Sequence, residues 1–130
     1  MVVYEIKKRN HDLLFKHISA ASLALLATVS SPANALAECF NATATFYHSA
    51  YEGGTTANGE TFSNSGYTAA IGDWRGFGYY RVTNEHTGAS VEVYANDRGD
   101  FGDNIDLSQA AFDAIGNLDS GVLDVQVCRL

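Results

Sequence analysis

The chain has 130 residues, with 15 acidic and eight basic side chains and a formal net charge of −7. That length fits one domain. The acidic excess argues against a nucleic-acid-binding protein, because such a protein needs a basic face. Hydrophobic residues make up 46% of the chain and aromatic residues 12%, which excludes a disordered chain. Two cysteines are too few for a disulfide-dense scaffold but enough for one bridge.

The first 37 residues have the pattern of an export signal. A basic lead is followed by an uncharged, largely apolar stretch at residues 18–29, and then by the small-residue pattern Ala35-Leu36-Ala37. This order is typical of a secretory signal peptide, and the apolar stretch is shorter than the roughly 20 residues that a membrane span needs. We predict a signal peptide at residues 1–37, cleaved near Ala37, and a secreted or periplasmic protein with no stable membrane anchor. An N-terminal anchor that is never cut is the alternative.

Cleavage there changes the charge and the meaning of the cysteines. Residues 38–130 contain 13 acidic and four basic side chains, a formal net charge of −9, and no lysine. Cys39 and Cys128 lie near the two ends, and export favours a disulfide between them. The bridge would close a loop of about 90 residues and contribute roughly 2–4 kcal/mol. Two free thiols are the alternative. We expect a monomer.

Four segments alternate apolar and polar residues as β-strands do, at residues 41–48, 78–84, 90–96 and 122–128. A turn that ends in Gly88 should join the second and third segments into a hairpin. In the last segment, Leu123, Val125 and Val127 should face the core.

One helix is expected near the C-terminus. Ser108 can cap it, Leu107, Ala111 and Ile115 recur every four residues, and Gly116 can end it. Residues 53–66 are rich in turn formers and should form a long loop or an irregular strand. About six short strands with one short helix predict a mostly β fold and a closed barrel.

The main group of candidate catalytic residues follows the third predicted strand. Asp97 comes directly after the apolar pattern and beside a glycine-bearing turn, which is a position that suits a general acid or base. The simpler interpretation is that Asp97 pairs with Arg98 or caps a turn. Glu60 follows the tight-turn pair Asn58-Gly59, and it could be a second carboxylate facing Asp97 or a solvated loop residue.

Other candidates are weaker. Trp74 lies in a glycine-flanked loop and could stack on a sugar ring, although a core role is as good an interpretation. Asp97, Asp100, Asp103 and Asp106 recur every third residue, but this spacing does not match an EF-hand. The histidines lack the helical spacing of a zinc site. We therefore expect no metal and no cofactor.

The order of the motifs resembles that of the rare lipoprotein A (RlpA)-like double-psi β-barrel family. The matching segments are residues 44–60 (ATFYHSAYEGGTTANGE), 67–70 (YTAA), 80–84 (YRVTN), 96–99 (NDRG) with Phe101, and 105–108 (IDLS). Each motif is weak by itself, but five in order are specific. The resemblance covers nearly all of residues 38–130 and implies a six-stranded double-psi β-barrel with one or two short helices and one groove.

The resemblance also implies a function. Active members of the family are lytic transglycosylases that cleave the glycan strands of peptidoglycan, so peptidoglycan or a related cell-wall glycan is the expected partner. Asp97 would be the single acid/base, protonating the leaving oxygen and then helping the sugar's own 6-hydroxyl to attack. Glu60 would be a second polar residue at the catalytic site, and Asp106 would tie the barrel together through backbone hydrogen bonds. The expected substrate-binding residues are Thr56, Asn58, Arg98, Trp74 and Tyr47.

Two positions depart from the family pattern. Ile71 stands where the family has a histidine after its T-A-A segment, and Asp100 stands where it has proline. A compact barrel with one terminal disulfide also resembles expansin-like proteins. A non-catalytic, expansin-like module that binds cell-wall polysaccharide or loosens the wall is therefore the alternative function, ahead of a secreted effector or inhibitor on the same barrel.

Overall fold

A computed structural model describes residues 38–72 and 74–130. The predicted signal peptide lies outside the described residues, so its prediction stays untested. Within the part of the chain that the structure describes, no helix has both the length and the apolar character needed to cross a membrane.

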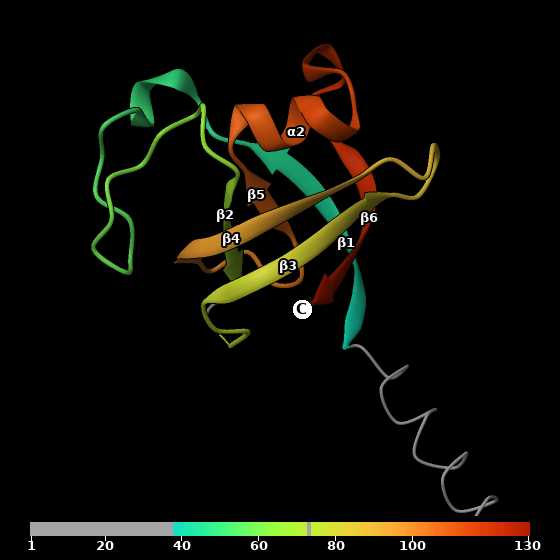
Figure 1. Cartoon of the computed structure of the whole chain (residues 1–130), viewed down its shortest axis with the longest axis horizontal. Helices are drawn as coiled ribbons and strands as arrows, with labels where there is room; N and C mark the ends of the chain where they lie inside the picture. The colour runs from blue at the N-terminus through green and yellow to red at the C-terminus, as the bar shows by residue number, and fades with distance from the viewer. Residues whose placement is uncertain (1–37, 73) are drawn as a thin grey trace, which may run out of the picture. The chain divides into compact units, whose positions relative to one another are not determined.

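Six strands close into a barrel (Figure 1). The strands are β1 (Cys39–Phe46), β2 (Thr68–Gly72), β3 (Gly78–Asn84), β4 (Ser90–Gly99), β5 (Ile105–Leu107) and β6 (Leu123–Arg129). Their order around the barrel is β1-β5-β2-β4-β3-β6. The pairs β1·β5 and β2·β4 are parallel, and the other four pairs are antiparallel. The predicted mostly β, closed six-stranded barrel is confirmed.

The remaining elements are short. Helix α2 spans Gln109–Ile115, and two 3-10 turns, η2 (Ser49–Tyr51) and η3 (Leu118–Ser120), lie in the connections. The predicted caps are observed: the Ser108 hydroxyl accepts a hydrogen bond from the Ala111 N–H, and Gly116 follows the last helical residue. The helix begins two residues after Leu107, because Leu107 belongs to β5 and packs in the core.

The alternating segments form strands as predicted. The hairpin of β3 and β4 is confirmed, with Tyr79 opposite Tyr94 in the antiparallel pair. Val125 and Val127 of β6 are fully buried, and Leu123 is partly buried against the core. Strand β1 begins and ends two residues earlier than predicted, because His48 instead caps η2.

Strands β2 and β5 were not among the predicted strands. They have five and three residues, and so short a segment shows little alternation. Both lie inside the barrel order, between β1 and β4, where they position the residues of the candidate site.

Helix α2 covers one end of the barrel (Figure 1). Its Phe112 is fully buried and packs edge-on against Phe46, with 4.9 Å between the ring centroids. Truncating such a buried phenylalanine to alanine costs about 3–5 kcal/mol of folding free energy. The helix therefore stabilises the barrel from the end at which β1 leaves for the candidate site.

A disulfide joins Cys39 to Cys128, which confirms the predicted bridge. The two residues are direct partners in the antiparallel β1·β6 pair, so the bridge fastens two neighbouring strands at the closure of the barrel. Its two cysteines are 89 residues apart in sequence, so the bridge restricts most of the unfolded domain.

Candidate active site

An irregularity in β4 orients Asp97. Along the parallel β2·β4 pair, Ala69 is opposite Ala95 and Ala70 is opposite Asp97, so Asn96 is an extra residue on β4. An extra residue of this kind is a β-bulge, which changes the direction of the side chains that follow it. Ala95 packs in the barrel core, whereas Asp97 lines an open cleft on the outside.

This cleft, called the Asp97 cleft below, has a volume of about 230 Å³. Its walls come from the end of β1 and η2, from the loop at residues 53–66, and from β2, β4 and β5. The lining residues are Tyr47, Tyr51, Gly54, Thr55, Thr56, Phe62, Ala70, Asp97, Arg98, Phe101 and Asp106. The loop and η2 form the green segment at the left of Figure 1.

Two donors hold the Asp97 carboxylate. The Tyr47 hydroxyl donates to Asp97 Oδ2 over 2.5 Å, and the Ala57 N–H donates to Asp97 Oδ1 over 2.9 Å. Hydrogen bonds to an ionised carboxylate are short and stronger than bonds between neutral groups. The donors come from opposite walls, so they fix the carboxylate between β1 and the loop.

Tyr47 is held as a donor. Burial raises the pKa of its phenol far above the usual range, and the hydrogen bond to Asp97 and the Asp97 charge raise it further. The ring packs edge-on against Phe62, with centroids 4.3 Å apart. Tyr47 therefore keeps its proton at any physiological pH, and its direction is fixed by packing.

Asp106 lies in the same cleft, which differs from the role expected for it. Among the residues that the structure describes, the hydrogen bond at its side chain comes from the Thr45 hydroxyl, 3.0 Å from Asp106 Oδ1, and not from backbone groups. Burial raises the pKa of Asp106. The Thr45 bond lowers this pKa, and the Asp97 charge raises it. The cleft thus contains two carboxyl groups in different surroundings.

Hydrogen bonds and a buried phenylalanine attach the loop at residues 53–66 to the barrel. Phe62 is buried and exchanges backbone hydrogen bonds with Gly53 and Gly54. At the far end of the loop, the Ser108 hydroxyl donates to the Gly66 carbonyl. The Asn58 N–H donates to the carbonyl of the bulge residue Asn96. The loop wall of the cleft is therefore built by specific bonds.

The expected site residues of this loop divide into two groups. Thr56 is buried and lines the cleft, and its hydroxyl donates to Asn58 Oδ1 over 2.7 Å. Asn58 in turn donates to the Glu60 carboxylate. Neither Asn58 nor Glu60 is among the lining residues. The structure thus brings Tyr47, Thr56 and Arg98 together with Asp97, and leaves Asn58 and Glu60 as supports of the loop.

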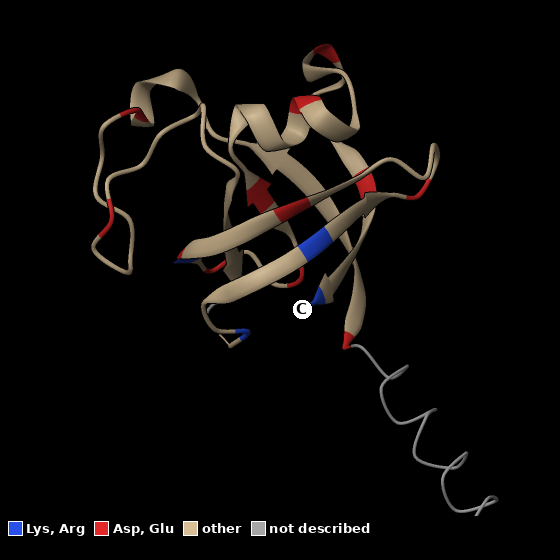
Figure 2. Ribbon diagram, viewed as in Figure 1, with Lys and Arg blue, Asp and Glu red and all other residues tan. Residues whose placement is uncertain are grey.

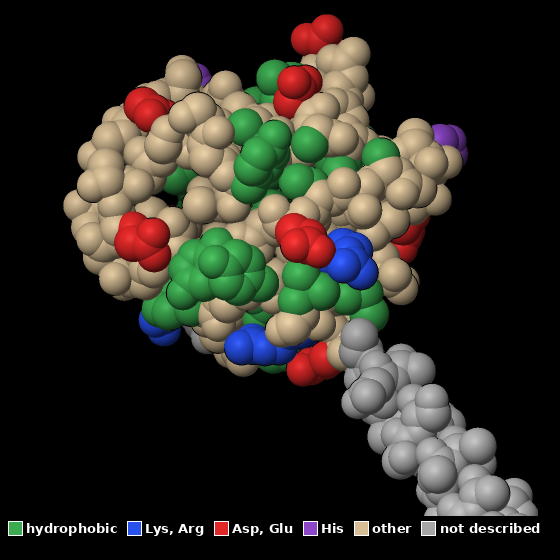
Figure 3. All heavy atoms as spheres, viewed as in Figure 1, with side chains coloured by type: hydrophobic (Ala, Val, Ile, Leu, Met, Phe, Trp, Pro, Cys, Tyr) green, Lys and Arg blue, Asp and Glu red, His purple; other side chains and the backbone are tan. Residues whose placement is uncertain are grey.

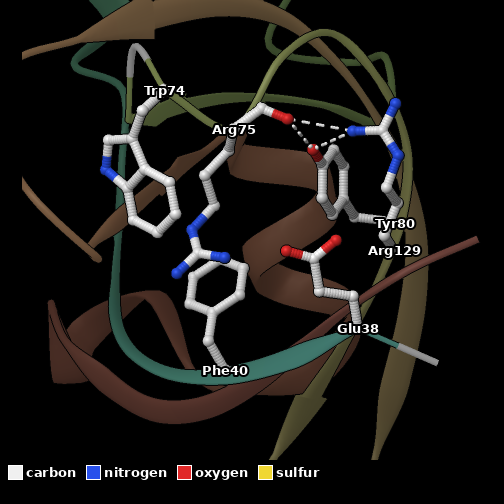
Figure 4. Close-up of a pocket in the computed structure, with 6 residues that line it drawn as sticks. All are labelled: Glu38, Phe40, Trp74, Arg75, Tyr80 and Arg129. Carbon is white, nitrogen blue, oxygen red and sulfur yellow. Dashed lines mark hydrogen bonds between the residues drawn. The ribbon is translucent and has the colours of Figure 1, made fainter. Parts of the chain in front are cut away.

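Trp74 lies elsewhere. It helps to line a second pocket of about 160 Å³, called the Arg75 pocket below, whose residues are Glu38, Phe40, Trp74, Arg75, Tyr80 and Arg129 (Figure 4). The Arg75 guanidinium lies 3.3 Å from the Phe40 ring centroid and 3.6 Å from that of Trp74. It also pairs with Asp103 over 2.9 Å. Trp74 is 65% exposed and does not line the Asp97 cleft.

Sequence reasoning missed the floor and one end of the cleft. Ala70 and Phe101 line it, but an alanine gives no chemical signal in a sequence. A Cβ at Gly99 would collide with the Phe101 ring, so glycine there lets the ring lie against the end of β4. Ile71, in place of the family histidine, is 1% exposed and packs in the core, away from the cleft.

Acidic residues are scattered over the strands, the helix and the loops of the described domain, and basic residues are few (Figure 2). The hairpin face of β3 and β4 carries the Arg81–Glu92 ion pair and, beside it, an apolar patch (Figure 3). The ring centroids of Tyr79 and Tyr94, which belong to these strands, are 4.9 Å apart. Among residues 38–72 and 74–130, no group of three His, Cys, Asp or Glu side chains is arranged to hold a metal ion.

The sequence is similar to known cell-wall proteins. Residues 40–127 match the family model described as "Lytic transglycolase". The endolytic peptidoglycan transglycosylase RlpA of Pseudomonas aeruginosa strain UCBPP-PA14 is 44% identical over 87 residues, covering 65% of this chain and 26% of that protein. Its namesake in Neisseria meningitidis serogroup A is 38% identical over 101 residues, covering 75% of this chain and 42% of that protein. This chain thus spans less than half of these curated relatives.

Solved structures share the barrel. The Streptomyces papain inhibitor has a TM-score of 0.58 and 26% identity, and the match covers 70% of this chain and 93% of the inhibitor. The apo expansin of Clavibacter michiganensis has a TM-score of 0.58 and 18% identity, and the match covers 72% of this chain and 50% of the expansin. At that identity the expansin shares the fold alone. With its closed barrel and the family match over residues 40–127, the chain belongs to the RlpA-like family of double-psi β-barrel domains.

Proposed function

We propose that this domain is an exported lytic transglycosylase that cleaves the glycan strands of peptidoglycan. The observation that carries the proposal is the Asp97 carboxylate, which two donors hold in an open cleft at a strand end. The family match and the names of the Pseudomonas and Neisseria relatives support the same reaction. The disulfide supports action outside the cytoplasm, because such bridges persist in oxidising compartments.

The reaction requires two proton movements at one sugar. One proton must reach the glycosidic oxygen as its bond to C1 breaks, and one must leave the 6-hydroxyl of the same sugar as its oxygen attacks C1. The products are a 1,6-anhydro end and a free hydroxyl. In the simplest scheme, Asp97 makes both transfers in turn as the only acid/base. Such transfers by a positioned carboxyl group accelerate reactions by about 10²–10⁴-fold.

The Asp97 surroundings suit the half of this cycle that removes a proton. The Tyr47 hydroxyl and the Ala57 N–H stabilise the charged carboxylate while leaving it at the cleft surface. Neither donor takes up the proton that leaves the 6-hydroxyl. The Tyr47 phenol stays protonated because its pKa is raised, and the Ala57 backbone N–H is a donor only. Thr56 and Arg98 also line the cleft, and we expect them to contact sugar hydroxyl or carboxylate groups beside Asp97.

The anionic character of the domain bears on substrate choice. Thirteen acidic residues against four arginines in residues 38–130 repel an anionic polymer at low salt. Arg98 is the basic residue among those lining the cleft, and its guanidinium lies 4.4 Å from the Phe77 ring centroid. We infer that the glycan strand is engaged locally, beside Arg98, and that uncrosslinked or peptide-stripped strands are the better substrates.

Product analysis tests the function. Purified protein is incubated with peptidoglycan sacculi, and the soluble products are identified by mass spectrometry. The proposal requires anhydro-muropeptides from the wild-type protein and none from Asp97→Asn, with both proteins binding sacculi equally. The Asp113→Asn variant, which alters an exposed carboxylate on α2, is the matched control and should behave as wild type.

A second candidate function gives a different outcome in the same experiment. The Clavibacter expansin was also solved as a mutant in complex with cellohexaose, with a TM-score of 0.55 and 19% identity to this chain. That likeness supports a barrel that binds glycan, which is the non-catalytic alternative when no cleavage follows. Sacculus binding with no soluble product from the wild-type protein would favour this module over the enzyme.

A further inference from the structure

One strand separates the two aspartates of the cleft. On β2, Ala70 is the register partner of Asp97 on β4, and it is also the partner of Asp106 on β5. Residues that are paired across neighbouring strands point to the same face of a sheet. Asp97, Ala70 and Asp106 therefore form one row across three strands, with a methyl group between two carboxyl groups.

The neighbours in sequence confirm which face this row occupies. Ala69 and Leu107, which are themselves a register pair, belong to the buried core. Because side chains alternate along a strand, Ala70 and Asp106 point outward, and all three members of the row line the Asp97 cleft. The small Ala70 side chain leaves the floor between the carboxyl groups open.

The spacing of the row suits a reacting sugar. Adjacent strands lie about 4.8 Å apart, so two strands separated by a third place their backbones about 10 Å apart. In enzymes that hold a water molecule between two carboxyl groups at a sugar, those groups are about 6.5–9.5 Å apart. This strand spacing is compatible with a carboxyl separation on that scale, and we expect a sugar whose own 6-hydroxyl attacks to fit between the two groups.

The two carboxyl groups differ in their donors. Asp97 accepts hydrogen bonds from the Tyr47 phenol and from the Ala57 backbone N–H. Among the described residues, the Thr45 hydroxyl is the only donor seen at the Asp106 carboxyl group. Burial and the nearby Asp97 charge raise the pKa of Asp106. Two carboxyl groups that share one cleft but have different hydrogen-bond donors are the arrangement expected of one base and one acid.

We propose that Asp106 is a second catalytic residue, which supplies the proton to the leaving glycosidic oxygen while Asp97 takes the proton from the attacking 6-hydroxyl. This inference rests on the proposed transglycosylase function and replaces its single acid/base with a pair. The C1–oxygen bond to the leaving sugar breaks and the bond from C1 to the 6-oxygen forms. The 6-hydroxyl proton passes to Asp97 and the Asp106 proton passes to the leaving oxygen. Proton exchange with water restores both groups, so no other reactant is needed.

Leaving-group dependence distinguishes an acid from a structural residue. Sacculi contain a poor leaving group that needs a proton, whereas dinitrophenol leaves a muramyl glycoside without one. Asp106→Asn should therefore lower kcat on sacculi by about 10²–10⁴-fold but lower the rate of dinitrophenol release at most a few-fold. Asp97→Asn should lose both activities. A variant that failed through misfolding would also lose both, so spared dinitrophenol release shows that Asp106→Asn is folded.

The pH profile gives an independent readout. The groups that face Asp106 are the Thr45 hydroxyl from β1, the Tyr47 phenol after it, and the Asp97 carboxylate and Arg98 guanidinium from β4. Of these, Asp97 carries the other carboxyl group in the cleft. Wild-type kcat on sacculi should fall on the alkaline side as Asp106 loses its proton, and Asp106→Asn should lack this limb.

The outcomes separate the two proposals. If Asp106→Asn retains the wild-type rate and pH profile on sacculi, the proposal that Asp106 acts as the acid is wrong. Asp97 then acts alone, and the proposed function stands. If Asp106→Asn has the circular-dichroism spectrum of the folded wild-type protein but loses dinitrophenol release as fully as cleavage of sacculi, Asp106 is not an acid. If the wild-type protein makes no anhydro product, the proposed function fails and the inference falls with it.

Discussion

The Asp97 cleft and the Arg75 pocket contain the same kinds of side chain but use them differently. In the Arg75 pocket the charged group is enclosed: two rings cover the Arg75 guanidinium, and the Tyr80 and Arg129 side chains both donate to the Arg75 carbonyl (Figure 4). In the Asp97 cleft, the Tyr47 hydroxyl and the Ala57 N–H donate to the carboxylate, which still lines an open cleft. An aromatic ring beside a charge is therefore a poor guide to a site unless the charge remains accessible.

The largest expected effect is on catalysis in the cleft. Asp97→Asn keeps the shape of the side chain and removes its ability to exchange a proton, so the rate of anhydro-product release should fall by about 10²–10⁴-fold. Asp100→Asn, in the exposed turn three residues away, is the matched control and should stay within about twofold. Equal losses in the two variants would show that overall charge, and not the Asp97 site, matters.

The corresponding change in the Arg75 pocket should affect folding instead. Arg75→Ala removes a side chain that is 10% exposed and whose guanidinium is packed between two rings. We expect a loss of about 1–3 kcal/mol in unfolding free energy, measured by urea denaturation. Cleavage per folded molecule should be unchanged. A large fall in kcat with unchanged stability would mean that the two pockets are not separate in function.

The phenol that holds Asp97 provides a graded test. Tyr47→Phe removes one hydrogen bond to the carboxylate and keeps the ring that packs on Phe62. A hydrogen bond to a charged group is worth about 1.5–3 kcal/mol, so kcat should fall by about tenfold or more, with KM nearly constant. An unchanged kcat would show that the Ala57 N–H alone positions Asp97.

Stability against pH tests the state of Asp106. Because the folded protein raises the pKa of this group, folding binds its proton more tightly, and its ionised form destabilises the fold at neutral pH. Asp106→Asn should therefore have a higher Tm than wild type at pH 7, and the difference should shrink as the pH falls below the ordinary range of aspartate. A lower Tm at pH 7 would mean that the charge is stabilising there.

The smallest effect is expected at Trp74. Its exposed ring stacks on Arg75 and lies outside the cleft, so Trp74→Ala should change cleavage of short glycan fragments by less than about twofold. A tenfold rise in KM for long strands, with no change for short ones, would extend the binding surface from the cleft to this loop.

Sequence patterns predicted the parts of the molecule that depend on local order. The hairpin of β3 and β4 follows from alternation and a glycine turn, and α2 follows from the Ser108 cap and a four-residue apolar repeat. The disulfide follows from two cysteines near the ends of a domain that the sequence predicts to be exported. The hairpin and the helix can be predicted from a short stretch of sequence, and the disulfide from the number and position of the cysteines.

The parts that were not predicted depend on distant pairing. The bulge at Asn96 appears only when β4 is aligned with β2, and the row through Ala70 exists only because β2 lies between β4 and β5. Asp106 was expected to be structural, because nothing near it in sequence places it beside Asp97. Trp74 was grouped with the site by residue type, although its loop packs on Phe40 instead.

The most direct test of the central claim is the source of the oxygen at the cleaved end. Wild-type protein is incubated with sacculi in water enriched in heavy oxygen, and the new glycan ends are analysed by mass spectrometry. A transglycosylase that uses the sugar's own hydroxyl should give anhydro ends with no heavy oxygen. Reducing ends that carry the label would show attack by water, and they would contradict the account.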